Sequence, residues 1–177
     1  MKKKAPAFLI LCVITLIAAV LLAVTNAFTS GPIEAAAQAA ADAARAAVLP
    51  GADAYEPVAL SGGVQVDNLY IGSKDGAVVG YTATATVQGS QGPVEVTLGA
   101  DAAGVITGVS VGGSKFAETA GLGTECQKPA FTDQFVGKSG SLALGSGVDA
   151  ISGATITSNA VVKGANLCTE AIAEASK

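Results

Sequence analysis

The 177-residue sequence contains no histidine, and only 14% of its residues are charged. Without histidine the chain cannot build a His-ligated haem, a histidine-containing zinc site or a Ser-His-Asp triad. Its three cysteines include no Cys-x-x-Cys pair, which argues against a cysteine-ligated metal. We therefore expect no metal site and no catalysis by such a triad.

Positive charge is scarce outside the N-terminus. The net charge is −4, and removing Lys2, Lys3 and Lys4 leaves −7 for the rest of the chain. Binding to nucleic acid depends on cationic neutralisation of phosphates. A domain this acidic is unsuited to that task, so we expect no nucleic-acid partner.

An uncharged apolar run extends from Ala5 to Ala27. An apolar helix needs roughly 20 residues to cross a bilayer. We predict a cytoplasmic leader at residues 1–4 and a transmembrane helix at residues 5–28. A cleaved signal peptide is the alternative, but its apolar region is typically about 7–15 residues followed by a small-residue cleavage site. The lysines before the span predict a cytoplasmic N-terminus in the cell membrane and an extracytoplasmic domain.

The cysteines permit further interpretations. Cys12 suggests a lipidated cysteine, but Leu11 precedes it where a small residue is expected, and apolar residues continue beyond it. We expect Cys12 to be a membrane-facing side chain. Cys126 and Cys168 lie in the exported part of the chain, where a disulfide is chemically possible, and the sequence leaves that question open.

An alanine-rich segment occupies residues 29–51. Alanine is the best helix former, and Pro50-Gly51 is a strong stop signal. We predict a helix from Ile33 to Val48 that forms a stalk on the membrane surface, since its side chains are too small for a strong core-facing stripe.

The middle of the chain carries strand signals. Residues 76–89 alternate threonine with valine, and two further period-2 runs follow between residues 91 and 113. The turn at residues 100–104 ends in Gly104, where a positive φ is expected. We predict an antiparallel meander with one buried face. On that face we place Val94, Val96 and Leu98.

In the last third of the sequence, we predict an irregular segment followed by a helix. Residues 115–140 lack periodicity, whereas residues 157–176 have helical spacing of apolar side chains. Residues 52–177 are long enough for a single α+β domain, an antiparallel sheet flanked by helices. The expected anchors are Phe116, Phe131 and Phe135 in the irregular segment, and Val161, Leu167, Cys168 and Ile172 on one helix face.

Four hydroxyls crowd the stretch DAISGATITSNAV, residues 149–161. Thr157 or Ser158 could cap the following helix, which would be a purely structural role. A helix N-terminus also offers unpaired N–H groups and a partial positive charge, which could hold a phosphate. The residues alone leave both interpretations open.

Two motifs resemble the family of flavinylated FMN-binding domains. Residues 149–155, DAISGAT, match the flavinylation motif D-x-x-(S/T)-G-A-(T/S), and residues 118–123, ETAGLG, resemble the family element H-x-E-T-P-G-L-G. Over essentially its whole length the chain is similar to G subunits of the Rnf complex, a membrane-bound ferredoxin:NAD⁺ oxidoreductase. Phe116 and Ala120 stand where the family has histidine and proline, so any role of that histidine cannot operate here.

The resemblance implies one covalent FMN per chain, linked by a phosphoester bond to the hydroxyl of Thr155 and installed by a flavin transferase. Ser152 and Thr157 would be hydrogen-bonding neighbours, while Gly153 and Ala154 would leave room for the ribityl phosphate. The flavin ring would lie against the second motif. The residues expected there are Glu118, Thr119, Gly121, Leu122 and Gly123.

The implied function is that of a membrane-anchored electron-transfer subunit. Its partners would be the other membrane and peripheral subunits of an Rnf-type complex coupled to ion translocation, with no independent catalytic activity. The alternatives are the related C-type component of the Na⁺-translocating NADH:quinone reductase and a free-standing extracytoplasmic FMN-binding protein. A pilin-like structural protein is the alternative from another class, although it would leave the flavinylation motif unexplained.

Overall fold

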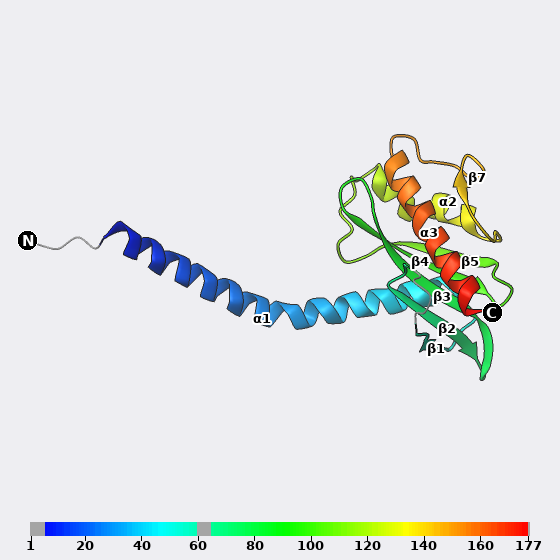
Figure 1. Cartoon of the computed structure of the whole chain (residues 1–177), viewed down its shortest axis with the longest axis horizontal. Helices are drawn as coiled ribbons and strands as arrows, with labels where there is room; N and C mark the ends of the chain where they lie inside the picture. Colours follow the sequence, from blue (N-terminus) through cyan, green and yellow to red (C-terminus); the bar gives the residue numbers. More distant parts are fainter. Residues whose placement is uncertain (1–5, 60–64, 177) are drawn as a thin grey trace, which may run out of the picture. The chain divides into compact units, whose positions relative to one another are not determined.

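The computed structural model describes residues 6–59 and 65–176 (Figure 1). The predicted cytoplasmic leader, residues 1–4, lies outside them. Contacts within the chain divide it into two units, Met1–Ala39 and Ala40–Lys177. The boundary falls inside the first helix, α1 (Ala7–Val48).

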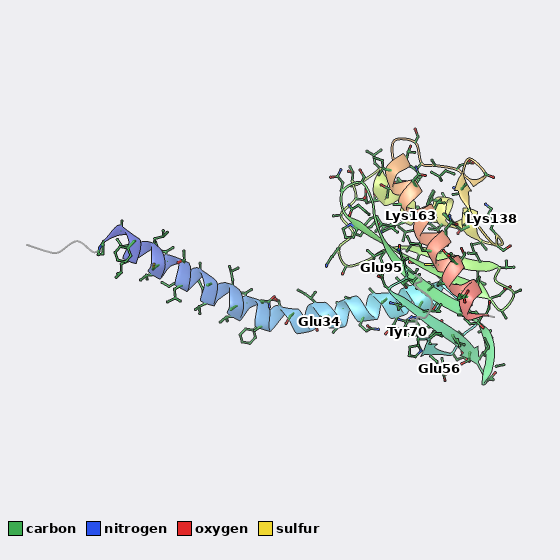
Figure 2. The ribbon with its side chains drawn as sticks, viewed as in Figure 1. Glu34, Glu56, Tyr70, Glu95, Lys138 and Lys163 are labelled. Carbon is green, nitrogen blue, oxygen red and sulfur yellow. The ribbon has the colours of Figure 1, made fainter. Side chains whose placement is uncertain are left out.

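The first unit is the apolar part of α1. An 18-residue window there has a mean hydropathy of 3.2 and is entirely unburied (Figure 2), so the helix is long and apolar enough to cross a membrane. Its threonine hydroxyls bond within the helix: Thr15 donates to the carbonyl of Leu11 at 3.0 Å, and Thr25 donates to that of Leu21 at 2.9 Å. The hydrogen bonds of these hydroxyls are thus satisfied within the helix. This suits a lipid environment, which offers no water as a partner.

Helix α1 runs without a break through Pro32. Sequence analysis expected a membrane span ending at residue 28 and a helix beginning at Ile33, and the structure joins the two in one continuous helix. Proline removes one hydrogen bond from the helical ladder, and the strong helix formers after it continue the helix. The predicted stop is confirmed, because α1 ends at Val48, just before Pro50-Gly51.

The second unit contains a five-stranded antiparallel sheet in the order β1-β2-β3-β4-β5. The predicted meander is confirmed, and the turn residue Gly104 has a φ of +79°. Sequence analysis missed β1, which is very short, and β2, whose register shifts at a bulge after Gly72. The strands are β1 (Ala54–Pro57), β2 (Asn68–Lys74), β3 (Ala77–Gln88), β4 (Pro93–Asp101) and β5 (Ile106–Gly112).

Helix α3 (Thr155–Ala175) covers one face of the sheet, over β3 and β4 (Figure 1). The predicted inward side chains Val94, Val96 and Leu98 are each 0% exposed. The α3 side chains Val161 and Cys168 are equally buried and pack against them. This face is therefore the apolar core of the domain.

The other face of the sheet is also buried in its centre, which corrects the prediction of a single buried face. Here threonines take the place of valines: Thr84 and Thr97 share a hydrogen bond at 3.1 Å, and the buried hydroxyl of Thr82 has no partner among the described residues. The end of α1 packs on this face. A Cβ added at Gly108 would lie 2.9 Å from the Cα of Val48, so the glycine permits this close approach.

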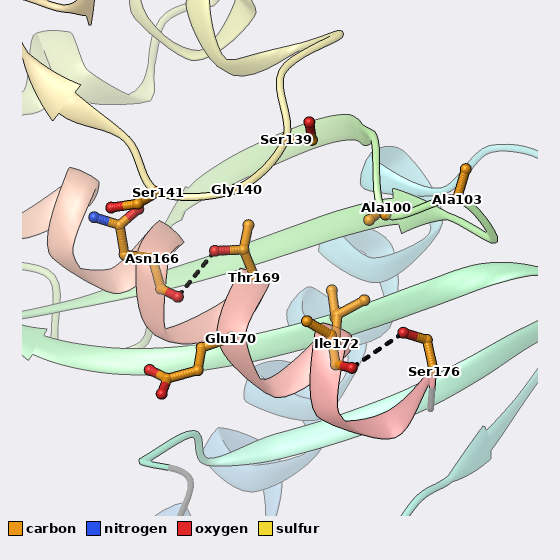
Figure 3. Close-up of a pocket in the computed structure, with 12 residues that line it drawn as sticks. Ala100, Ala103, Ser139, Gly140, Ser141, Asn166, Thr169, Glu170, Ile172 and Ser176 are labelled. Carbon is orange, nitrogen blue, oxygen red and sulfur yellow. Dashed lines mark hydrogen bonds between the residues drawn. The ribbon is translucent and has the colours of Figure 1, made fainter.

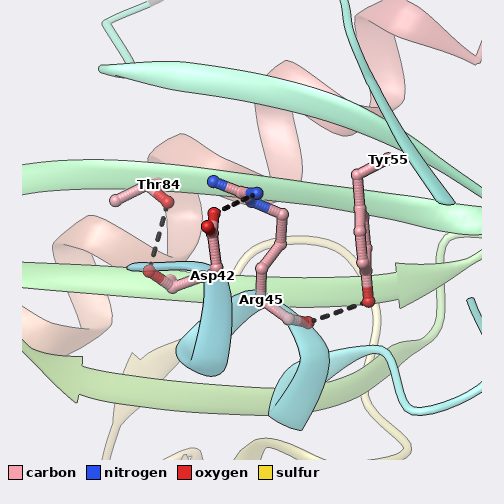
Figure 4. A network of polar contacts seen from close by, with 5 residues as sticks. Asp42, Arg45, Tyr55 and Thr84 are labelled. Atoms are coloured by element: carbon pink, nitrogen blue, oxygen red, sulfur yellow. Dashed lines mark hydrogen bonds and ion pairs between the residues drawn. The ribbon is translucent and has the colours of Figure 1, made fainter. Parts of the chain in front are cut away.

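Arg45 lies at the end of α1 next to Tyr55 of β1 (Figure 4), and its guanidinium also lies over the ring of Tyr70 in β2. Its guanidinium lies 2.9 Å from Asp42 Oδ1 and 4.0 Å from the ring centroid of Tyr70. The hydroxyl of Tyr55 donates to the carbonyl of Leu49 at 3.1 Å. Burial raises the pKa of Tyr55, and the charge of Arg45 opposes that rise. Residues 40–48 thus belong to the folded domain, although they were predicted to lie in a separate stalk.

The segment between β5 and α3 is irregular, as predicted. Phe131 and Phe135 are buried with ring centroids 5.5 Å apart, and the half-buried Phe116 packs against the core. These aromatic anchors are confirmed. The short elements of the segment are η1 (Gly123–Gln127), α2 (Pro129–Thr132), η2 (Asp133–Phe135), β6 (Ala143–Leu144) and β7 (Gly147–Val148).

Candidate functional site

The site lies at the start of α3, which begins at Thr155 rather than at the predicted Thr157. Ala154 occupies the N-cap position and makes no side-chain capping bond. The predicted capping role of Thr157 or Ser158 is wrong, because both lie inside the helix with 2% and 0% exposure. The N–H groups of the first helical turn are therefore left without a side-chain cap, while Thr155 itself is exposed.

Ser158 holds the turn that precedes the helix. Its Oγ donates to the carbonyl of Ala154 at 3.0 Å and accepts from the N–H of Ile151 at 3.1 Å. Between these two residues Gly153 has a φ of +76°, a conformation that favours glycine. Ser158 thus fixes the turn from the side of the core. The other side of the turn, which carries Thr155, is exposed to solvent.

Glu118 connects three segments beneath the same turn. Its carboxylate is buried: Oε2 accepts from the hydroxyl of Thr157 at 2.8 Å, and Oε1 accepts from the N–H of Gln91 at 3.0 Å. A Cβ added at Gly123 would lie 2.5 Å from Oε2, so this position requires glycine. These bonds make Glu118 a link between the loop, the β3–β4 hairpin and helix α3. The contact between Glu118 and a flavin ring, which the resemblance implies, stays a prediction.

The two sequence motifs meet in a pocket of about 360 Å³. This volume lies near the lower end of the range, about 300–1,000 Å³, found for small-molecule sites. Ser152 and Gly121 do not line it, although they were predicted contacts. Sequence analysis missed three lining residues, two from the β3–β4 hairpin and one from the helix start. The lining residues are Ser90, Gln91, Glu118, Thr119, Leu122, Gly123, Gly153, Ala154, Thr155, Ile156 and Thr157.

Two exposed apolar side chains flank Thr155. Leu122 is 42% exposed and Ile156 is 64% exposed. Outside α1, the other exposed large apolar residues in the described part of the chain are Val78 and Val136. A Cβ added at Gly153 would come within 3.0 Å of Leu122 Cδ2, so the leucine lies directly against the turn. An apolar ligand of flat shape fits against such side chains, and a phosphate fits the uncapped helix start.

A larger hollow, of about 480 Å³, lies along the C-terminal half of α3 (Figure 3). Asn166 bonds both backbone groups of Leu142 there, accepting at 2.8 Å and donating at 2.9 Å. Thr169 donates to the carbonyl of Asn166 at 2.9 Å. The side chains of Asn166 and Thr169 thus bond the protein itself, and none of the predicted site residues lines this hollow.

Cys126 and Cys168 are both free and buried. Cys126 Sγ lies 3.9 Å from Ser158 Oγ, and Cys168 Sγ lies 3.6 Å from the carbonyl oxygen of Val96. Burial raises the pKa of both thiols, while the Ser158 hydrogen bond opposes the rise at Cys126. Both cysteines therefore behave as small core side chains.

Comparison with known proteins gives matches over most of the chain. Residues 89–170 match the family of FMN-binding domains. The chain is 38% identical to the G subunit of the Na(+)-translocating ferredoxin:NAD(+) oxidoreductase complex of Acetobacterium woodii, over 96% of this chain and 91% of that protein. It is also 38% identical to the G subunit of the ion-translocating oxidoreductase complex of Methanosarcina acetivorans, over 85% and 84% of the two chains.

Two solved structures resemble part of the fold. The C-type component of the Na(+)-translocating NADH-quinone reductase from Parabacteroides distasonis aligns over 59% of this chain and 58% of its own, with 26% identity and a TM-score of 0.47. Shewanella oneidensis NqrC aligns over 68% and 65%, with 19% identity and a TM-score of 0.45. The aligned region spans less than two thirds of each of those chains.

The two sequence relatives decide the family. Their identity of 38% extends over nearly the full length of both partners in each comparison. The FMN-binding match includes both motifs that line the pocket. The chain therefore belongs to the family of G subunits of ion-translocating oxidoreductase complexes and contains an FMN-binding domain.

Proposed function

We propose that this chain is the electron-transfer subunit of an Rnf-type complex and carries one FMN bound covalently at Thr155. The observation that carries the proposal is the pocket in which the flavinylation motif and the Glu118–Gly123 loop meet. These motifs are separated in sequence, yet both line one hollow beside the exposed hydroxyl. The relatives from Acetobacterium woodii and Methanosarcina acetivorans support the assignment to such a complex rather than to a pilin-like protein.

The position of Thr155 supports the proposal that the flavin is attached there. Its exposed side chain stands at the first position of α3, where the uncapped N–H groups favour a phosphate. A flavin transferase would transfer the FMN group, with its phosphate, from a flavin dinucleotide donor. The Thr155 Oγ–phosphorus bond would form as the pyrophosphate P–O bond of the donor breaks. The second nucleotide would leave with the bridging oxygen, and the hydroxyl proton would pass to solvent.

The remaining lining residues would orient the cofactor. Leu122 would lie against the flat ring, and Thr157, which bonds Glu118, would keep the loop beneath it in place. FMN, when bound, supplies the electron-transfer chemistry, and the protein supplies position and electrostatics. Electrons would pass to and from neighbouring subunits of the complex, while ion translocation occurs elsewhere.

Membrane attachment would come from the apolar part of α1. The lysines at positions 2–4 favour a cytoplasmic N-terminus, so the FMN domain would face the extracytoplasmic side of the cell membrane. A topology reporter fused after Lys177 should be active on that side. A reporter active only in the cytoplasm would reverse the orientation.

The attachment site is tested with Thr155→Val and Thr155→Ser. Valine keeps the shape of threonine but removes the oxygen, so we expect no fluorescent flavin band on a denaturing gel and no flavin increment in the intact mass. Serine keeps an oxygen and should restore both signals in part or in full. A fluorescent band from the valine variant would show that the flavin is attached elsewhere.

A further inference from the structure

Glu118 is the one charged residue lining the pocket. Its carboxylate oxygens both act as acceptors, one toward the Thr157 hydroxyl and one toward the Gln91 N–H, a pattern that suits the ionised form. The ion pairs in the described part of the chain join Arg45 to Asp42 and Lys128 to Glu125. Among the described residues, the negative charge of Glu118 therefore has no cation paired with it in the pocket.

We propose that the charge of Glu118 lowers the reduction potential of the flavin held at Thr155. The inference rests on the proposed function. Each electron added to a bound ligand makes that ligand more negative, and a nearby carboxylate opposes this change. Interactions between charges are stronger in a partly desolvated site than in water, because the effective dielectric constant is lower.

Glu118 would act through space and not by touching the reacting ring. Both its oxygens already bond protein groups, and Gly123 packs against the same carboxylate. The side chain is only 8% exposed, so bulk water and salt screen its charge little. Its position is fixed from three segments, which keeps the charge at a constant distance from the pocket.

The test is Glu118→Gln in the full-length protein, titrated in detergent with dithionite while the flavin spectrum is recorded. Glutamine has the same shape and can keep both bonds. Its carbonyl accepts from the Gln91 N–H, and its amide donates to the Thr157 oxygen. We expect covalent flavin as in wild type and a midpoint potential shifted upward.

A matched control separates the Glu118 charge from other charges of the region. Glu125→Gln removes a charge from the same region, but that carboxylate is paired with Lys128 and is not in the pocket, so the midpoint should not move. A Glu125→Gln shift as large as that of Glu118→Gln would overturn the proposal.

A second route covers the case in which Glu118→Gln does not fold. The double variant Glu118→Met, Thr157→Val replaces both bonded side chains by apolar groups of similar size, a change that is often nearly neutral for stability. Its midpoint should also lie above that of wild type. A midpoint equal to or below wild type in whichever variant folds refutes the role of Glu118, whereas a wild-type protein without a flavin band refutes the proposed function instead.

Discussion

Helix α3 borders one hollow at its start and another along its C-terminal half, and the smaller hollow is the better candidate for a site. The hollow along the C-terminal half is the larger of the two, with a volume of about 480 Å³ compared with about 360 Å³ at the helix start. In that hollow, however, the side-chain amide of Asn166 already makes two hydrogen bonds to the backbone of Leu142. At the start of α3 the helical N–H groups are uncapped and Leu122 and Ile156 are exposed. The smaller hollow is therefore the better candidate because its N–H groups and apolar side chains are free to contact a ligand, although the other hollow is larger.

Ser158→Ala should have the largest effect at the start of the helix. The change removes the hydroxyl that bonds both Ile151 and Ala154 and leaves a partly buried N–H without its partner. We expect a loss of about 1–3 kcal/mol in the free energy of unfolding, together with less covalent flavin, because the turn before Thr155 is released. Thermal unfolding and gel fluorescence measure the two effects. Full flavin loading in a destabilised variant would contradict the role of this turn.

Asn166→Ala is the matched change at the other end of the helix. It removes two hydrogen bonds to Leu142, which should lower the free energy of unfolding by about 1–2 kcal/mol. The flavin content should equal that of wild type, since none of these groups lines the pocket at Thr155. Intact mass gives the fraction of flavinylated chains. A reduced fraction would mean that the two hollows are not independent.

Leu122→Ala should alter the flavin without altering the fold. The side chain is 42% exposed, so its removal should change the free energy of unfolding by no more than about 0.5 kcal/mol. The proposed phosphoester would keep the flavin attached, but the ring would lose the surface on which it is proposed to lie. We expect a shifted absorption spectrum and a shifted midpoint potential. Values identical to wild type would place the ring away from this loop.

The smallest effect concerns the two buried thiols. Burial raises the pKa of Cys126 and Cys168, so less of the reactive thiolate is present at neutral pH than for an ordinary cysteine. A thiol-reactive reagent should label both only after denaturation, without prior reduction. The exposed Cys12 is replaced by serine for this measurement. A requirement for reductant would reveal a disulfide between them.

The periodicity of the sequence predicted the strands and the helix whose formation depends on neighbouring residues. Alternation located β3, β4 and β5, and helical spacing located α3 to within two residues at its start. The flavinylation motif indicated a turn at the correct place. These features depend on residues a few positions apart, where the periodicity of strand and helix is visible in the sequence.

The missed features depend on distant partners. Thr157 was predicted as a helix cap, but its hydroxyl donates a hydrogen bond to the carboxylate of Glu118. Glu118 lies 39 residues away in the sequence, so no local pattern indicates this bond. The end of α1 was predicted as a free stalk because alanines gave no apolar stripe. Its docking uses Arg45, two tyrosine rings and the close approach of Val48 to glycines. No pattern within the helix reveals that surface.

The docking of residues 40–48 on the sheet also limits how far the domain can travel. In the proposed anchor, only residues 29–39 remain between the membrane span and the compact unit. Eleven residues reach about 17 Å as a helix and at most about 40 Å fully extended. With that anchor, the FMN-binding domain would stay within this distance of the bilayer. A cofactor fixed in the same membrane would meet it at a high effective concentration, as two modules do on a short linker, so electron exchange would not depend on diffusion from bulk solution.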